Sequence, residues 1–245
     1  MTNAGVRQWN ATSGRQTNMA HLKSLSAPKT WPIERKKHVF VTKANPGPHT
    51  KENALPFIVV VRDMLKIVHT THEAKKIITA GKVLVNNRIR KETKYPVGML
   101  DSISIPGSNE YYRVLFNAQG KFITKKISPE QAKEKYVKIQ NKTTLKGKRT
   151  QLNFLDGSNM LIDKDNYKVG DTLLLQEGKV KHLKFEKGAW VYIVAGKHIG
   201  KKGRLEEVLT FKGSQPDRVV LKQENEKIDT LREFAFVVDE GFEHG

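Results

Sequence analysis

The chain has 245 residues and a formal net charge of +19, and 38% of its residues are hydrophobic. It contains no cysteine, which excludes disulfides and cysteine-ligated zinc, and no apolar run approaches the roughly 20 residues that a membrane-spanning helix needs. Such an excess of positive charge predicts a polyanionic partner, and the lack of an apolar secretion signal predicts a cytoplasmic protein.

Positive charge extends over most of the chain. The net charge is +7 for residues 1–52, +5 for residues 53–106, +7 for residues 107–183 and zero for residues 184–245. This spread predicts contact along an extended anion rather than one charged pocket. The same boundaries divide an expected α+β multi-module fold into a basic N-terminal arm, a helical-hairpin domain with strands, a central β domain and a C-terminal SH3-like β-barrel.

Residues 1–52 are predicted to form an extended arm, because glycine and proline interrupt regular structure, apart from a short helix at His21–Leu25. Residues 1–18 fit no pattern, and Met19 is a candidate initiator. One aromatic residue, Trp31, stands among Lys29, Arg35, Lys36 and Lys37. This setting predicts either stacking of the indole on a nucleic-acid base or packing against the next domain.

Residues 53–106 predict two helices followed by short strands. Apolar residues from Leu55 to Val68 keep helical spacing and predict the first helix. Thr70 or Thr71 is expected to cap a second helix that ends at Gly81. Asn86 and Asn87 tolerate positive φ and predict a hairpin turn, and the last strand is expected over Ser102–Ile105.

This part resembles a small RNA-binding domain first named from a bacterial ribosomal protein. The resemblance is carried by Arg62-Asp63, Glu73-Ala74-Lys75 and the run from Gly81 to Asn86. It implies binding to structured RNA through helix-borne cations, the alternative being a solvated charged face. His69 and His72 have no third ligand nearby, so we expect no metal site.

Residues 107–183 alternate like a small β domain. Strands are expected over residues 112–116, 121–123, 151–154 and 172–175, and Ser128 with Pro129 predicts the start of a short helix. A basic segment follows, comprising Lys142, Lys146, Lys148 and Arg149. It either touches RNA or protects an exposed edge strand.

Three glycines and three lysines lie between Gly196 and Gly203. A phosphate-binding loop of the Walker type needs four residues between its glycines and a hydroxyl after the lysine. Only three residues separate Gly196 from Gly200, and Lys202 follows Lys201, so an ATPase is excluded. Residues 187–196, a turn and residues 200–205 together resemble instead the KOW motif, a strand–loop–strand of small β-barrels, although Ala189 stands where that family often has an acidic residue. The resemblance implies that the loop cations meet RNA phosphates.

The last 22 residues carry a net charge of −5. We expect Phe234–Val238 to complete the barrel and the acidic tail to remain in solvent.

The arm carries the most specific resemblance, in His21-Leu22-Lys23, residues 27–33 and Pro46-Gly47-Pro48-His49. With the order of the parts, these motifs make the chain from about Met19 onward similar to the small-subunit ribosomal protein family S4e of eukaryotes and archaea. The resemblance implies a structural, rRNA-binding component of the small ribosomal subunit that supports assembly and translation. It also implies neighbouring ribosomal proteins as partners, no catalysis, no cofactor and no small-molecule substrate.

Two other functions remain open. An RNA-modifying enzyme could carry the helical domain as an accessory, but it needs a further catalytic domain of about 150 residues, and a transcription elongation regulator could use the KOW motif.

The residues expected to contact RNA are Lys29, Trp31, Arg35, Lys36, Lys37, Arg62, Lys66, Lys75, Lys76, Arg88, Arg90, Lys91, Lys197, His198, Lys201 and Lys202.

Overall fold

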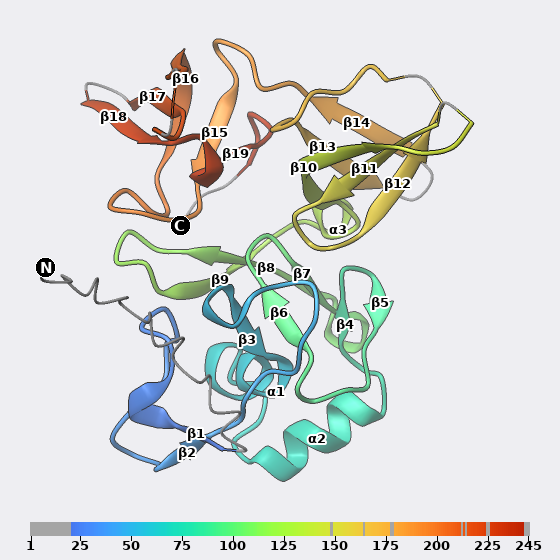
Figure 1. Ribbon diagram of the computed structural model, residues 1–245. Coiled ribbons are helices and arrows are strands. Elements are labelled where there is room, and N and C mark those ends of the chain that lie inside the picture. The colour runs from blue at the N-terminus through green and yellow to red at the C-terminus, as the bar shows by residue number, and fades with distance from the viewer. Residues whose placement is uncertain are drawn as a thin grey trace, which may run out of the picture.

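The protein is described by a computed structural model, mostly β with few helices (Figure 1). The described residues are 21–147, 149–163, 165–176, 179–211, 213, 215–223 and 226–242. The expectations for residues 1–18 and Met19 lie outside this range, as does Lys148. None of the helices formed by the described residues has the length and apolarity that a bilayer crossing requires.

Residues 21–126 form one unit, the N-terminal module, in the lower half of Figure 1. Its main sheet is antiparallel, in the order β5-β4-β7-β8-β9. The strands are β4 (Leu84–Val85), β5 (Arg88–Ile89), β7 (Ser102–Ile105), β8 (Glu110–Phe116) and β9 (Phe122–Lys126). A smaller pair joins β3 (Ala54–Pro56) to β6 (Pro96–Gly98).

Local signals confirm most of the expected helical hairpin. The first helix comprises α1 (Phe57–Val59) and a π-helical turn at Val60–Met64, and it ends before Val68 because Lys66 adopts a φ of 52°. In α2 (Thr71–Thr79), Thr70 and Glu73 form a reciprocal capping box. Gly81 follows the helix with a φ of 72°. The hairpin turn is also confirmed, with φ values of 50° and 62° at Asn86 and Asn87.

The main sheet continues across the expected boundary at residue 106. β8 pairs with β7, and β9 pairs with β8. Phe116 and Phe122 belong to the same buried cluster as Phe57 and Val85. The two strands assigned from the sequence to the central domain therefore complete the sheet of the N-terminal module.

The expected extended arm is wrong for residues 21–52, which fold onto this module. The expected helix at residues 21–25 is replaced by β1 (Leu22–Lys23) and a 3-10 turn at Ser24–Ser26, because β1 pairs with β2 (Phe40–Val41). Trp31 is 1% exposed and lies in the main buried cluster. The backbone amide of Phe122 in β9 donates to the carbonyl of Thr30 at 2.9 Å.

His49 anchors the end of this N-terminal segment. Its imidazole ring packs against Gly98. A Cβ atom at position 98 would lie only 2.3 Å from this ring, so the contact requires glycine there. The His49 Nε2 atom lies 2.9 Å from Oδ2 of the buried Asp101, which also accepts from Asn86 Nδ2 and the Gly98 amide. Burial alone lowers the pKa of His49, but the ion pair and hydrogen bond with Asp101 outweigh it and leave the pKa raised.

The central module has one antiparallel sheet in the order β12-β11-β10-β13-β14. Its strands are β10 (Lys135–Thr144), β11 (Thr150–Phe154), β12 (Asn159–Ile162), β13 (Thr172–Gln176) and β14 (Lys179–Leu183). The expected short helix is confirmed as α3 (Pro129–Ala132), with Ser128 in a capping box. The long central strand β10 was not among the strands predicted from the sequence.

The C-terminal module is the third five-stranded antiparallel sheet, in the order β18-β17-β16-β15-β19. Its strands are β15 (Trp190–Ile193), β16 (Lys202–Leu209), β17 (Arg218–Gln223), β18 (Glu226–Leu231) and β19 (Ala235–Val237). The glycine–lysine segment is confirmed as a loop between two strands, and the register of β16 shifts at a bulge between Leu205 and Glu207.

A shared apolar cluster joins the three modules. It contains Leu115 of β8, Tyr136 of β10 and Tyr192 of β15. The Tyr192 hydroxyl accepts from the Phe116 amide at 2.9 Å and donates to the Phe116 carbonyl at 3.1 Å. Phe242 is also buried in this cluster, so the acidic tail does not simply extend into solvent as expected.

We expect the pH dependence of folding to report the His49 anchor. Because the folded-state pKa of His49 is raised above 6.5, its contribution is complete below pH 6.5 and is lost as the pH rises through the raised value. The unfolding free energy from urea titrations should therefore fall as the pH rises above about 6.5. H49Q should flatten this fall, whereas H38Q, which changes an exposed histidine, should leave the fall unchanged. An unchanged pH profile in H49Q would contradict the anchor.

Candidate nucleic-acid interface

A groove separates the β1–β2 hairpin from the helical hairpin of the N-terminal module. Residues from β2, from the end of the first helix and from the start of α2 line it. The side chains that bring positive charge or imidazole rings to its walls are Lys37, His38, Arg62, Lys66 and His69. The groove therefore brings together expected RNA contacts from two regions that are distant in sequence.

Arg62 is held in a fixed position on the groove wall. Its Nε and Nη2 atoms donate to the two carboxylate oxygens of Asp63 at 2.7 and 2.8 Å, and its Nη1 atom donates to Thr71 Oγ1 at 2.7 Å. The hydrogen bond to Asp63 raises the pKa of Arg62. Through these bonds Arg62 joins the two helices. Because Asp63 balances its charge locally, Arg62 adds little net charge to the groove.

The outer face of α2 carries cations that have no ion-pair partner within the described part of the chain. Ala74 and Ile78 are buried against the module, so the exposed Lys75 and Lys76 stand on the opposite side of the helix. Thr71, at the start of the same helix, lines the groove. This arrangement places the two lysines next to the groove on a rigid element, as RNA phosphate recognition requires.

The β4–β5 hairpin extends this basic surface beyond the other end of α2. A Cβ on Gly81, just after α2, would fall 3.0 Å from Ile89 of β5, so the two elements are in contact. Arg88 and Lys91 are exposed. Arg90 is instead half-buried, and its guanidinium lies 4.6 Å from the centroid of the Tyr95 ring. Its side chain therefore contributes to the packing of the module.

The N-terminal segment divides its expected contacts between surface and interior. Lys29, Lys36 and Lys37 are exposed. Trp31 is buried, so of its two predicted roles the structure shows packing, and base stacking by this residue is wrong. Arg35 is a second correction, because its guanidinium donates to the carbonyls of Ser24, Ala27 and Pro28 at 2.5 to 3.3 Å and holds the segment's own backbone.

The glycine–lysine loop divides its cations in the same way. Lys197 is exposed and His198 is half-buried, while Lys201 Nζ lies 3.5 Å from a carboxylate oxygen of Glu226. Lys202 as an RNA contact is wrong. Its side chain is 9% exposed, its Nζ donates to the carbonyls of Glu240 and Phe242 at 2.8 Å each, and burial lowers its pKa.

Gly200 explains where this loop lies. It has a φ of 83°, and a Cβ here would fall 2.7 Å from the carbonyl oxygen of Asn117, in the turn between β8 and β9. Ile199 in the same loop packs against the N-terminal core. The loop is therefore seated on the N-terminal module, and glycine is needed for the close approach rather than for wrapping a phosphate.

One candidate contact was missed in the sequence. Lys121 is exposed in the β8–β9 hairpin, between Phe122, which hydrogen-bonds Thr30, and Gly120, which contacts Ile199. This places it near the exposed Lys29 and Lys197, and none of the three has an ion-pair partner among the described residues. No local signal marks Lys121, because the three segments meet only through long-range contacts.

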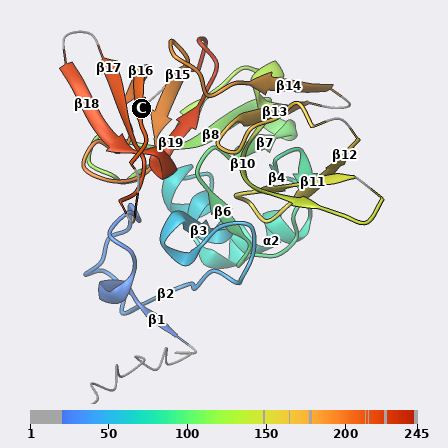
Figure 2. The ribbon, with the colours of Figure 1, turned by 45° about the horizontal axis from the view of Figure 1, so that its top comes forward.

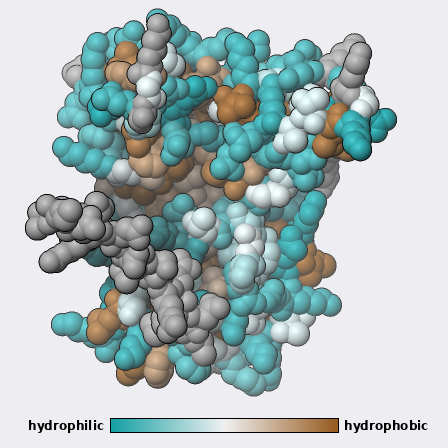
Figure 3. Space-filling view, viewed as in Figure 1, coloured by the Kyte–Doolittle hydropathy of each residue, from teal (hydrophilic) through white to brown (hydrophobic). Residues whose placement is uncertain are grey.

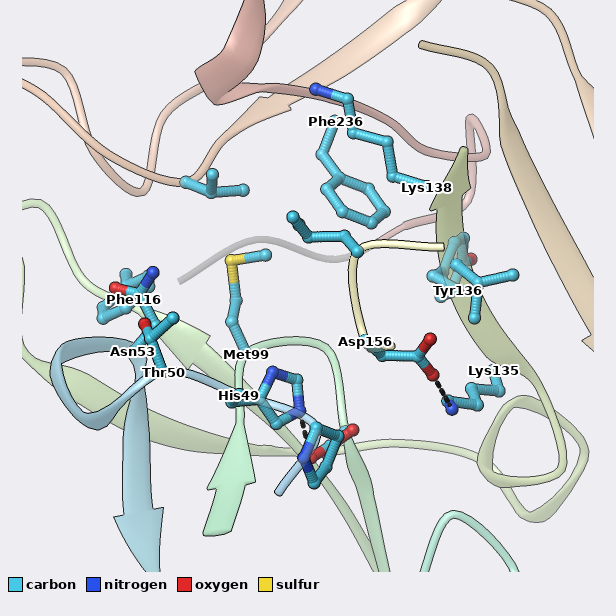
Figure 4. Close-up of a pocket in the computed structure, with 15 residues that line it drawn as sticks. His49, Thr50, Asn53, Met99, Phe116, Lys135, Tyr136, Lys138, Asp156 and Phe236 are labelled. Atoms are coloured by element: carbon cyan, nitrogen blue, oxygen red, sulfur yellow. Dashed lines mark hydrogen bonds and ion pairs between the residues drawn. The ribbon is translucent and has the colours of Figure 1, made fainter. Parts of the chain in front are cut away.

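A smaller cavity lies at the junction of the three modules (Figure 4). Each charged side chain that lines it already has a structural partner. His49 pairs with Asp101 and Lys135 with Asp156, and Lys138 donates to the carbonyls of Arg232, Glu233 and Ala235. Burial lowers the pKa of Lys138 to about 8. No cluster of potential metal ligands is found in the described part of the chain.

The surface seen in Figure 3 is polar over most of its area, with apolar side chains gathered at the seam between the upper and lower halves. Nine of the sixteen predicted contacts are exposed: Lys29, Lys36, Lys37, Lys66, Lys75, Lys76, Arg88, Lys91 and Lys197. The geometry offers a polyanion a band of cations along the groove, α2 and the β4–β5 hairpin. A separate group lies where the glycine–lysine loop meets the N-terminal module.

Three parts of the chain match known families. Residues 108–181 match the family described as Ribosomal family S4e, residues 19–52 match the RS4NT (NUC023) domain, and residues 59–103 match the S4 domain.

Whole-length relatives agree with these matches. The chain is 44% identical over 221 residues to the small ribosomal subunit protein eS4 of Archaeoglobus fulgidus, which covers 89% of this chain and 92% of that protein. It is 44% identical over 231 residues to eS4 of Methanocaldococcus jannaschii, covering 89% and 93% of the two chains. The crystal structure of the 30S ribosomal protein S4e from Thermoplasma acidophilum is similar with a TM-score of 0.67 and 30% identity, covering 77% of this chain and 96% of that one.

The distinction between buried and exposed lysines can be tested directly. In K202M the carbonyls of Glu240 and Phe242 lose their donor, and we expect the unfolding free energy in urea to fall by about 1–3 kcal/mol. K197M changes an exposed side chain and should alter it by less than about 0.5 kcal/mol. Equal stability of the two variants would show that Lys202 has no structural role.

Proposed function

The chain belongs to the S4e family of ribosomal proteins, and we propose on this basis that it is a structural component of the small ribosomal subunit that binds rRNA. The observation that carries the proposal is the match of nearly its whole length to small-subunit proteins at 44% identity. The exposed cations of the groove and α2 supply the physical means.

The proposed mechanism is the sum of many weak phosphate contacts. Lys75 and Lys76 lie on α2 and Arg88 lies in β5, and Lys37 and Lys66 lie at the groove in segments between the regular elements of the same module. Each phosphate contact releases counterions, so several contacts of modest strength add up to high affinity. Cations on helices and backbone contacts suit the recognition of folded RNA by shape.

We infer that the C-terminal module is a small barrel of the KOW type. Its five strands, with the bulge in β16 and a glycine-rich loop between β15 and β16, support this assignment. Lys197, His198 and Lys201 would then contact RNA at the loop, beside Lys29 and Lys121. Because the loop is seated on the β8–β9 turn, its cations stand at a fixed distance from those of α2.

We also propose that the protein catalyses no reaction and acts in the cytoplasm as part of the ribosome. The charged groups of the junction cavity are paired with one another or with backbone carbonyls, which suits a packing role. Partners would be rRNA and neighbouring ribosomal proteins. An RNA-modifying enzyme or an elongation regulator would instead associate with ribosomal subunits only in traces.

Sedimentation of cell lysate separates these functions. A structural component should co-migrate with small ribosomal subunits at about one copy per subunit and should remain there after washing at moderate salt. Quantitative mass spectrometry of gradient fractions measures the ratio. A ratio far below one copy, or migration with RNA polymerase, would contradict the proposal.

The salt dependence of RNA binding tests the proposed mechanism. Binding of the full chain to small-subunit rRNA should weaken steeply as KCl increases. In the double variant K75Q/K76Q the slope of log affinity against log salt should decrease by about 1 to 2, because about two phosphate contacts are lost. Urea unfolding serves as the control and should show unchanged stability. An affinity indifferent to salt, or an unchanged slope in the variant, would overturn the role of α2.

A further inference from the structure

An apolar patch is exposed where the N-terminal segment turns back on itself. Leu25 is 75% exposed, Val39 is 67% exposed and Phe40 is 58% exposed. Brown side chains appear at the lower left of Figure 3, where Figure 1 places β1 and β2. Figure 2 shows that this hairpin projects from the rest of the chain, so the core of the protein does not cover it.

The pairing of β1 with β2 determines which way Phe40 faces. Leu22 pairs with Val41, and both pack against the main core. Side chains alternate across a strand, so the next pair, Lys23 and Phe40, faces away from the core. An exposed aromatic ring therefore has a lysine directly opposite it on the neighbouring strand.

Phe40 also lines the groove already described. The same groove is lined by Lys37, His38 and Lys66. Lys66 has no ion-pair partner among the described residues. The ring of His21 lies 5.7 Å from that of Phe40, in a tilted arrangement. The patch thus combines one accessible aromatic face with cations on several sides.

This combination fits unpaired RNA better than a protein. The core of a protein–protein interface is depleted of charged residues. Here Lys23 lies opposite Phe40, and the groove beside the ring is lined by Lys66 and by Lys37, which pairs with Glu34 at 3.1 Å. Single-stranded nucleic acids are bound by an aromatic ring that stacks on a base while nearby cations meet the phosphates. Base stacking was one of the two roles that the sequence predicted for Trp31, but the structure buries that indole and exposes Phe40 instead.

We propose that Phe40 is a stacking platform for an unpaired base of rRNA, with Lys23, Lys37 and Lys66 contacting the flanking phosphates. This inference rests on the proposed rRNA-binding function and adds a ligand class to it: a bulged or looped-out nucleotide beside the helical RNA recognised by α2. The groove would then receive the splayed strand.

The test uses the full chain with three RNA probes. These are small-subunit rRNA, a single strand of about ten nucleotides carrying one 2-aminopurine, and a duplex of the same sequence. The variants are F40A, F40W and the matched control F211A, which removes an exposed aromatic ring from the C-terminal module. Circular dichroism checks that each variant is folded.

We expect F40A to weaken binding of the single strand by roughly tenfold, as loss of one base stack predicts, with less than about twofold change for the duplex. Quenching of 2-aminopurine should be lost in F40A, retained in F40W and unchanged in F211A. Equal effects of F40A and F211A, or an unchanged quench in F40A, would overturn the inference. If F40A altered self-association without altering RNA binding, the patch would be a protein contact and the inference would be overturned as well.

The probes also separate this inference from the proposed function. A wild-type chain that binds rRNA but not the single strand would refute the stacking site and leave the proposed function standing. A wild-type chain that binds none of the three probes at low salt would refute both.

Discussion

The hairpin of β8 and β9 provides the contacts that join the N-terminal segment and the C-terminal module to the main sheet of the N-terminal module. Phe116 on β8 exchanges two backbone hydrogen bonds with the buried Tyr192 hydroxyl, and Phe122 on β9 donates to Thr30 in the N-terminal segment. The turn between them receives the backbone of Gly200. One hairpin therefore fixes the N-terminal segment and the C-terminal module relative to the sheet beneath α2. Buried hydrogen bonds to backbone groups are costly to break, because they leave polar atoms without a partner.

The sequence was sufficient wherever structure is decided by neighbouring residues. The capping boxes at Thr70 and Ser128, the positive φ at Asn86 and Asn87 and the strands on either side of the glycine–lysine loop all follow from signals a few residues long. The composition and net charge also pointed to a polyanionic partner. These features depend on hydrogen bonds within one turn and on side-chain size, so a single sequence is enough to predict them.

The sequence was insufficient wherever the decisive partner is far along the chain. Lys202 binds carbonyls 38 and 40 residues away, and Lys138 binds carbonyls 94 to 97 residues away. Their residue types and local spacing do not distinguish them from surface lysines. The sequence could not decide between stacking and packing of Trp31 for the same reason, because the burial of Trp31 depends on the strand that contains Phe122. The cations of the candidate interface could therefore be proposed from the sequence, but they could not be sorted into exposed and internal ones.

This sorting changes how the net charge of +19 should be understood. Lysines such as Lys138 and Lys202 contribute to the total, yet their ammonium groups donate hydrogen bonds to backbone carbonyls inside the protein. Lys138 joins the central module to the C-terminal module, and Lys202 joins β16 to the carbonyls of Glu240 and Phe242. When one of two rigidly spaced sites is bound, the other is held at a high effective concentration near its own phosphates. In the proposed RNA complex, internal cations would support the affinity by keeping the modules in place, and only the exposed ones should appear in its salt dependence.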